Sequence, residues 1–311
     1  MQGLELSKKY FEHNKQILKK NFPEVYERMA FGLVGEGSEC FGFDDEISRD
    51  HDFEPAFSIW LTREDFETYG EQIQKVYEQL PKELDGISLK HNSAYGKNRR
   101  GVASIDSFYQ NKTGGKQGPE TLQDWLFVPE YSLAEAVNGE VFLDHLGAFS
   151  KVREKMLKGY PEDVRKKKIA ARAASMAQSG QYNYRRCLAH GESGAARLAL
   201  DEFIRHTIQM IYLLNNRYCP YYKWMFRGMS KLSILGDLAE SLTALLCAPD
   251  SEENLQVKLA IVEQISGKVI EELKHQKLSD SDSDYLESHA FSVMDKIEDE
   301  TLKKLHVMAG I

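Results

Sequence analysis

The chain has 311 residues, of which 42% are apolar and 28% charged, and its formal net charge is −8. That length suffices for two domains that each bury a core, and the acidic balance argues against a general nucleic-acid binder. Without an amino-terminal apolar run, an apolar stretch of about 18 residues or a CxxC pair among its scattered cysteines, the sequence predicts a cytoplasmic protein with reduced thiols and no membrane span.

The first half of the chain alternates helical and strand-like segments. Apolar residues at helical spacing predict a helix over 4–20, and Pro23 favours a short helix that ends near Met29. Strands are expected over 31–34, 50–61, 100–109 and 139–144, with helices over 62–80, 122–126 and 132–137.

From about residue 149 the strand signals vanish and the helical segments lengthen. Helices are expected over 149–158, 161–179, 181–189, 193–217, 220–228, 230–247, 252–275 and 283–305. We therefore predict an α+β fold, in which a small mixed-sheet α/β domain over 1–148 is followed by an all-α helical domain over 149–311.

Basic residues gather in one part of the helical half. Residues 151–190 hold eleven Lys or Arg against three acidic residues. A basic face beside an acidic cluster suits a phosphate-bearing ligand that arrives with its metal. The alternative is a solvated helix face that contacts no ligand.

The stretch 34–54 combines three glycines with a dense run of carboxylates. Asp50 and Asp52 alternate on a predicted strand, so both side chains point to one face, about 7 Å apart. Paired carboxylates repel unless they share cations, and Mg²⁺ prefers such oxygens beside a nucleotide phosphate. Gly37-Ser38 lies eleven residues upstream, where a glycine lets N–H groups approach a phosphate and a serine adds a donor. The stretch predicts phosphoryl or nucleotidyl transfer; the alternative is an acidic surface loop.

Two common phosphate-binding motifs are missing from the sequence. It contains no GxxxxGK[ST], which excludes a P-loop enzyme. Gly35-Glu-Gly37 does not continue to the third glycine of a dinucleotide site.

Gly37-Ser38, eleven intervening residues and Asp50-x-Asp52 resemble the signature of the nucleotidyltransferase fold of the polymerase-beta type, which includes kanamycin nucleotidyltransferase. The longer run Gly-Ser-x3-Gly-x-Asp-Asp-x-x-Ser-x-Asp-His-Asp is similar to one bacterial family that joins such a head to a helical domain of uncharacterised function. Further matches to that family are Gly139-x-Val-Phe-x-Asp144, Tyr160-Pro-x-Asp-Val164 and Tyr218-x-Pro-Tyr-x-Lys-Trp224. The likeness thus covers most of the chain.

The resemblance implies that Gly37 and Ser38 hold the phosphates of the nucleotide and that Asp50 and Asp52 hold Mg²⁺. One departure concerns Glu36, which precedes the glycine-serine pair where the wider superfamily usually has an apolar residue.

Active members of the superfamily usually carry a third carboxylate on a later strand, as metal ligand or general base. Asp106 is the best candidate, because alternation within the expected 100–109 strand would turn it toward the aspartate pair. The alternative is an acid at a strand end that faces solvent. Glu120 or Asp144 could substitute for it. A base is needed because the acceptor hydroxyl must lose a proton as it attacks phosphorus.

The densest aromatic patch of the helical half follows Pro220. Tyr221, Tyr222 and Trp224 could stack a base or sugar, and Lys223 could reach the triphosphate of the nucleotide. The alternative is a helix junction in which these rings pack together. Weaker candidates of the same kind are Arg185, Arg186 and His190.

These observations predict a Mg²⁺-dependent nucleotidyltransferase that moves NMP from an NTP to a hydroxyl of a small-molecule acceptor and releases pyrophosphate. The lysine-rich run 165–168 keeps a nucleic-acid acceptor such as tRNA as an alternative. The alternatives are a catalytically degenerate nucleotide-binding sensor or partner module, and a toxin-like enzyme that modifies RNA or protein. The sequence indicates neither the preferred nucleotide nor the oligomeric state.

Overall fold

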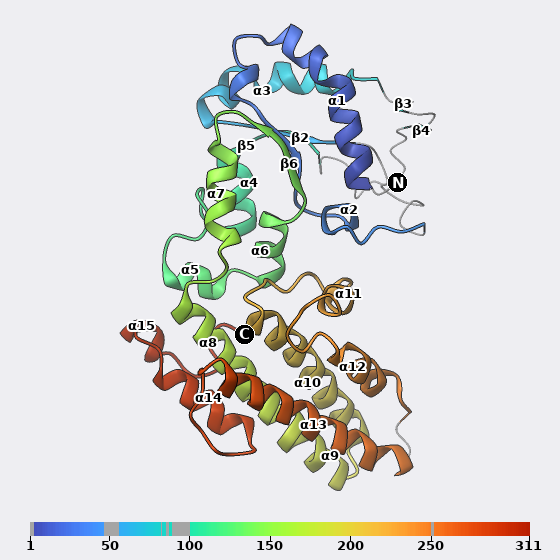
Figure 1. Ribbon diagram of the computed structural model, residues 1–311, viewed down its shortest axis with the longest axis vertical. Coiled ribbons are helices and arrows are strands. Elements are labelled where there is room, and N and C mark those ends of the chain that lie inside the picture. The colour runs from blue at the N-terminus through green and yellow to red at the C-terminus, as the bar shows by residue number, and fades with distance from the viewer. Residues whose placement is uncertain (1–2, 47–55, 82, 85–86, 89–99, 250–251) are drawn as a thin grey trace. The chain divides into compact units, whose positions relative to one another are not determined.

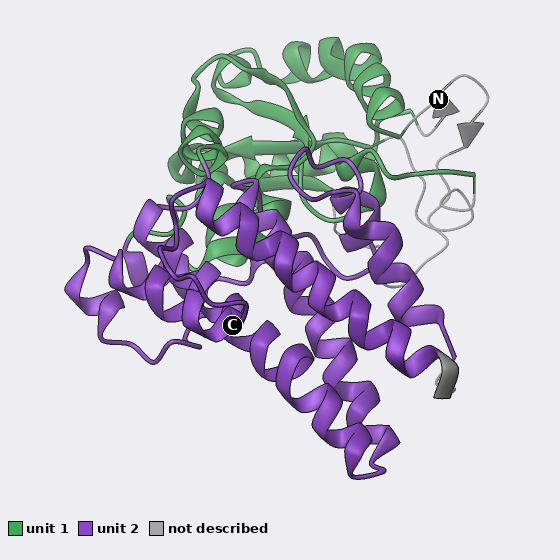
Figure 2. Ribbon diagram, turned by 60° about the horizontal axis from the view of Figure 1, so that its bottom comes forward, with its two compact units in different colours: residues 1–120, 132–158 green, residues 121–131, 159–311 purple. Residues whose placement is uncertain are grey.

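The structure is a computed structural model that describes residues 3–46, 56–81, 83–84, 87–88, 100–249 and 252–311 (Figure 1). Its chain forms two compact units (Figure 2). Unit 1 comprises Met1–Glu120 and Ser132–Lys158, and unit 2 comprises Thr121–Tyr131 and Gly159–Ile311. A small mixed sheet together with a helical region confirms the predicted α+β class.

Unit 1 contains a four-stranded mixed sheet with the order β5-β2-β1-β6. Its strands are β1 (Ala30–Leu33), β2 (Ser58–Leu61), β5 (Gly101–Ser104) and β6 (Glu140–Asp144). β1 pairs antiparallel with β2 and β6, whereas β5 runs parallel to β2. The chain therefore leaves β1 at the end of the sheet where β2, β5 and β6 begin. A separate antiparallel pair is formed by β3 (Glu83–Leu84) and β4 (Ile87–Ser88).

Helices cover both faces of this sheet (Figure 1). The helices that lie wholly within unit 1 are α1 (Gly3–Asn21), the 3-10 helix η1 (Tyr26–Arg28), α2 (Ser38–Phe41), α3 (Arg63–Glu78), α4 (Ile105–Thr113) and α7 (Ala148–Leu157). On the face covered by α1 and α3, the Phe11 ring lies 5.0 Å from that of Phe31 and 5.5 Å from that of Phe57. On the face covered by α4 and α7, Trp60 stacks on Phe149 at 4.0 Å. Side chains along β2 point alternately to the two faces of the sheet, so the strand contributes to a hydrophobic core on each face.

The strand expected over 100–109 is wrong beyond Ser104. The side chain of Ser104 accepts a hydrogen bond from the Ser107 N–H at 3.0 Å and so caps the start of α4. Asp106 consequently lies in the first turn of a helix and not on a strand. The second expected strand, 50–61, is observed from Ser58; its residues 50–55 lie outside the described residues.

The two compact units do not divide the chain after residue 148, where the sequence predicted the domain boundary. Helix α7, which follows that position, packs on β6 and on the ring of Trp60 within unit 1. Residues 121–131, which precede it, belong to unit 2. Packing of the Phe149 ring places α7 with the sheet.

Helices are the regular secondary structure of unit 2 among its described residues. Its helices are α5 (Leu122–Phe127), the first residues of α6 (Glu130–Val137), α8 (Glu162–Met176), the π-helix η3 (Ala177–Tyr184), α9 (Arg185–Ala189), α10 (Ser193–Leu214), α11 (Met225–Met229), α12 (Leu238–Cys247), α13 (Glu252–His275), α14 (Leu286–Asp295) and α15 (Glu300–Lys303). Several are shorter than expected: 230–237 forms turns, and the segment 283–305 is divided between α14 and α15.

Helix α8 is the centre of unit 2 and packs on both α10 and α14. Its buried alanines, Ala170, Ala171, Ala173 and Ala174, leave little side-chain bulk between the helices. None of the helices in the described part of the chain combines the length and apolarity needed to cross a bilayer.

A first prediction concerns two glycines with similar left-handed backbones. Gly139 and Gly147 have φ of 61° and 69°, but an added Cβ would lie 1.9 Å from the Leu33 carbonyl oxygen at the former and would contact nothing at the latter. We expect Gly139→Ala to lower the free energy of unfolding by about 3 kcal/mol, against about 1 kcal/mol for Gly147→Ala. Denaturant unfolding followed by circular dichroism measures both values. Equal losses would contradict the close approach of β1 to residue 139.

Candidate functional site

The turn that follows β1 contains the glycine-serine pair that the sequence singles out. Gly35 and Gly37 have φ of 119° and 110°, which residues with a Cβ rarely adopt. Gly37 is the N-cap residue of α2, and Ser38 is the first residue of this single-turn helix. The pair thus lies where the backbone leaves the sheet and changes direction.

Residues far along the chain hold this turn in place. The N–H of Gly35 donates to Asn138 Oδ1 at 2.8 Å, and Asn138 Nδ2 donates back to the Gly35 carbonyl at 2.7 Å. The N–H of Gly139 donates to the Cys40 carbonyl at 2.7 Å. These bonds satisfy backbone groups that the turn would otherwise leave unpaired.

Arg100 ties the same turn to the start of β5. Its Nη2 donates to the Glu36 carbonyl at 2.6 Å and to Glu39 Oε1 at 2.8 Å. The thiol of Cys40 donates to that carbonyl as well, at 3.3 Å. Burial raises the pKa of Cys40 to about 12, so the thiol stays protonated and keeps this bond.

Lys112 of α4 supplies a second cation at the turn. Its Nζ lies 2.9 Å from Glu36 Oε1 and 2.6 Å from Glu135 Oε2. Burial alone would lower the pKa of Lys112, but hydrogen bonds to Glu135 and Glu36 outweigh it and raise the pKa above its ordinary value. The ammonium therefore stays charged.

A cavity of about 440 Å³ opens beside these groups. It is lined by residues of the turn, β2, β5 and α4: Val34, Gly35, Glu36, Ser58, Trp60, Arg100, Gly101, Val102, Ala103, Ser107, Phe108, Asn111 and Lys112. The volume is that of a small-molecule site, and the lining combines two cations, one carboxylate, hydroxyl and amide groups, and two aromatic rings. Such a lining can take a ligand that has an anionic part and a flat part.

The predicted phosphate-binding pair adjoins this cavity. Gly35 and Glu36, which line it, directly precede Gly37 and Ser38. The predicted metal pair, Asp50 and Asp52, lies outside the described residues. Among the residues that are described, no three His, Cys, Asp or Glu side chains group so as to hold a metal ion.

The candidates for a third carboxylate are not among the residues that line the cavity. The Asp106 carboxylate, in the first turn of α4, accepts a hydrogen bond from Gln117 Nε2 at 3.3 Å. Asp144 pairs with Ala30, at the end of β1 remote from the turn, and accepts from the Ser150 N–H at 2.8 Å. Glu120 is exposed. The strand position predicted for Asp106 is wrong, and its catalytic role stays a prediction.

The predicted aromatic patch belongs to unit 2. Lys223 lies exposed in a turn before α11. The rings of Tyr221 and Tyr222 are exposed, with centroids 4.4 Å apart, whereas Trp224 packs beneath the guanidinium of Arg227. Arg185, Arg186 and His190 lie at an exposed helix end, apart from these rings in the sequence.

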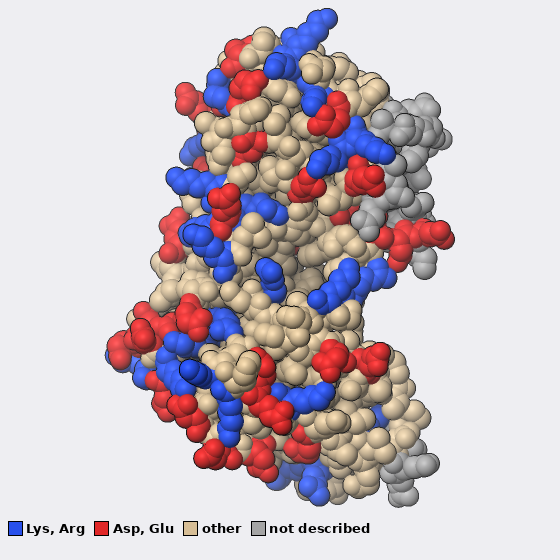
Figure 3. Space-filling model, viewed as in Figure 1, with Lys and Arg blue, Asp and Glu red and all other residues tan. Residues whose placement is uncertain are grey.

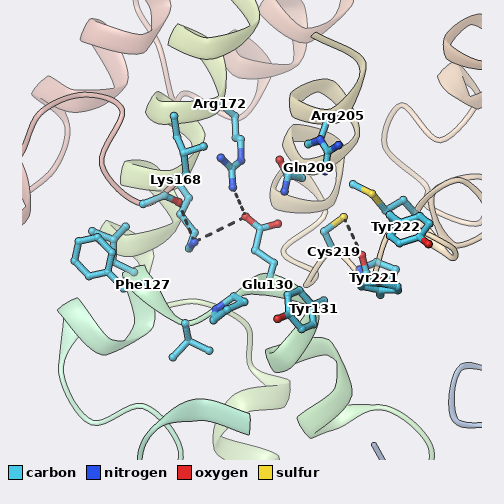
Figure 4. A pocket seen from close by; sticks show the side chains of 17 residues that line it. Phe127, Glu130, Tyr131, Lys168, Arg172, Arg205, Gln209, Cys219, Tyr221 and Tyr222 are labelled. Atoms are coloured by element: carbon cyan, nitrogen blue, oxygen red, sulfur yellow. Dashed lines mark hydrogen bonds and ion pairs between the residues drawn. The ribbon is translucent and has the colours of Figure 1, made fainter. Parts of the chain in front are cut away.

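The lysine-rich run does not form an exposed basic face. Lys167 and Lys168 are buried, and Lys167 Nζ donates to the carbonyls of His306 and Val307 at 2.6 and 3.0 Å. Lys168 and Arg172 both point to Glu130 (Figure 4). On the face drawn in Figure 3, basic and acidic side chains are interspersed. Three cations of the 151–190 segment, Lys167, Lys168 and Arg172, are thus buried and contact backbone carbonyls or one carboxylate.

Several residues that hold the turn, line its cavity or form the buried charge cluster of Glu130 were not predicted from the sequence. Asn138 was missed although an Asn-Gly pair before a strand is a turn signal. Arg100 and Lys112 carry no spacing signal, because contacts across the fold bring them to the turn. Glu130 and Arg172 are 42 residues apart, and only the packing of α8 against residues 121–131 joins them.

Comparison with known proteins adds one partial match. The family model of a domain of unknown function (DUF4037) matches residues 125–225, which is less than half of the chain. The matched segment includes Glu130, Arg172 and Tyr221. No curated protein and no solved structure matches the chain. The match therefore assigns no activity.

A second prediction concerns His206, which is buried on α10. Burial, with the nearby charge of Arg172, lowers its pKa to about 4, so the folded protein keeps the ring neutral where the unfolded chain protonates it. The free energy of unfolding should fall by about 2 to 3 kcal/mol as the pH drops from about 6.5 to 4.

The variant His206→Gln should lack this part of the pH dependence. Denaturant unfolding of both proteins at several pH values in that window gives the comparison. Parallel stability curves for the two proteins would contradict a neutral buried histidine.

Proposed function

We propose that unit 1 binds a nucleoside triphosphate in the cavity beside the Gly35–Ser38 turn and transfers its nucleotidyl group to an acceptor hydroxyl, with release of pyrophosphate. The observation that supports this most is the position of Arg100 and Lys112, two cations that line one cavity next to a glycine turn. Cations and turn N–H groups are the groups that bind phosphate oxygens in proteins.

We propose a place in the cavity for each part of the nucleotide from the chemistry of the lining residues. Arg100 and Lys112 would face the triphosphate, because they are the two cations among the described residues that line the cavity. Trp60 and Phe108 offer aromatic surface for the base, their centroids 5.5 Å apart in an edge-to-face contact. The side chains of Ser107 and Asn111 add hydrogen-bonding groups for the sugar.

Magnesium would depend on residues beyond the described lining. Glu36 is the one carboxylate among the described lining residues, and its Oε1 lies 2.9 Å from Lys112, so these residues alone do not fit the ion. Asp50 and Asp52 would hold it, and the bound ion would neutralise charge on the triphosphate. The turn, Arg100 and Lys112 would orient the phosphates whether or not the ion is bound.

A small molecule is the acceptor that we propose. Lys167 and Lys168 are buried, which removes half of the basic run that favoured a polynucleotide. The net charge of −8 points the same way.

A second candidate function is nucleotide binding without turnover. The observation that favours it is the place of Asp106 at the start of α4, outside the cavity lining. A site without a base would bind the nucleotide but would not activate the acceptor hydroxyl.

The third prediction separates these functions. We expect the full chain, incubated with Mg²⁺, each α-labelled NTP and a metabolite extract, to release pyrophosphate and to label an extract component. Asp52→Asn should abolish this release, and Lys112→Met should weaken nucleotide binding about tenfold through loss of a charged contact. Lys116→Met, which removes an exposed lysine outside the lining, is the matched control.

The outcomes point to different conclusions. Saturable nucleotide binding without pyrophosphate above the Asp52→Asn background supports the sensor. No nucleotide binding by a folded wild-type chain rejects both functions. Equal binding by the Lys112→Met and Lys116→Met variants would place the nucleotide elsewhere.

A further inference from the structure

Unit 2 contains a cavity of its own, of about 350 Å³, which the proposed function does not use. Its walls come from residues 126–131, α8, α10, the segment 219–225 and residues 310–311, all within unit 2 (Figure 4). The volume falls in the range of small-molecule sites.

Three buried charged side chains form one wall. Glu130, Lys168 and Arg172 are 6%, 2% and 2% exposed. Glu130 Oε1 lies 2.9 Å from Arg172 Nη2 and 3.8 Å from Lys168 Nζ. Two cations and one carboxylate leave a net charge of +1, which is costly to bury without a counter-ion.

The hydrogen-bonding capacity of this wall is not used up. Nε and Nη1 of Arg172 and Oε2 of Glu130 have no hydrogen-bond partner among the described residues. Burial lowers the pKa of Lys168 to about 8 even though Glu130 opposes the shift. An anion bound here would complete the hydrogen bonds of Arg172 and stabilise the charged ammonium.

The opposite wall is aromatic. Tyr131, Tyr221 and Tyr222 line the cavity and keep exposed ring surface. The ring of Tyr221 lies 5.9 Å from that of Tyr131 and 4.4 Å from that of Tyr222. Figure 4 shows these rings on the side of the cavity away from Arg172. Arg205, which is exposed on α10, adds a further cation to the lining.

We propose that this cavity binds a small aromatic anion, with its carboxylate or phosphate toward Arg172 and Lys168 and its ring against Tyr131, Tyr221 and Tyr222. The side chains of the lining include three cations and one carboxylate, which suits a ligand of one or two negative charges. The site shares no lining residue with the cavity of unit 1, because every residue that lines it belongs to unit 2.

The fourth prediction uses calorimetric titration of the full chain with four probes. Benzoate and phenyl phosphate test the two anionic groups, benzamide tests the need for charge, and inorganic phosphate tests the need for a ring. We expect at least one of the two aromatic anions to bind with a dissociation constant below about 1 mM, and benzamide and inorganic phosphate to bind at least about tenfold more weakly.

Two exposed lining residues test the location without disturbing the buried cluster. Arg205→Gln and Tyr222→Ala should each weaken binding of the aromatic anion about tenfold. Tyr182→Ala removes an exposed tyrosine of unit 2 outside the cavity and should leave binding unchanged. Circular dichroism verifies that each variant is folded.

Several results would overturn the proposal. If neither aromatic anion binds at about 10 mM, the cavity is a solvated gap. If benzamide binds as tightly as the better-binding aromatic anion, the site is not selective for charge. If inorganic phosphate binds as tightly as that anion, the tyrosines do not hold a ring. Unchanged affinity in both Arg205→Gln and Tyr222→Ala would place the ligand elsewhere.

Discussion

The turn between β1 and α2 keeps its shape because Asn138 pairs with both backbone groups of Gly35, at 2.8 and 2.7 Å. The backbone at Gly35 and Gly37 has positive φ, so no local helix or strand ladder can hold it. Asn138 and Arg100 supply that support from later parts of unit 1. The cavity beside the turn depends on this support, since Gly35 and Glu36 form part of its wall.

Buried charge is handled differently in the two units. At the turn, Lys112 is shared by Glu36 and Glu135, so each cation there faces at least one acceptor. In unit 2, Lys168 and Arg172 share a single carboxylate oxygen, and part of the guanidinium has no acceptor in the described structure. The first arrangement fixes the backbone of the turn. The second leaves positive charge that a ligand could neutralise.

Patterns local in the sequence predicted the α+β class, the helix α1 and the strand β6, because period and turn residues determine such elements directly. Alternation misled at Asp106, where Ser104 ends the strand by capping a helix. The lysine-rich run 165–168 suggested an exposed basic face. Lys167 and Lys168 are nevertheless buried, because backbone carbonyls and Glu130 from distant segments of the chain contact them. Such partners are fixed by tertiary packing and leave no spacing signal, which is also why Arg100 and Lys112 were missed.

The central claim is that the cavity beside the Gly35–Ser38 turn holds a nucleotide. Photolabelling of the full chain with azido-ATP, followed by mass spectrometry of its peptides, tests this most directly. We predict saturable labelling, displaced by ATP, in peptides that contain Trp60 or Phe108, which line the cavity. Labelling confined to peptides of unit 2, or labelling that excess ATP does not reduce, would contradict the claim.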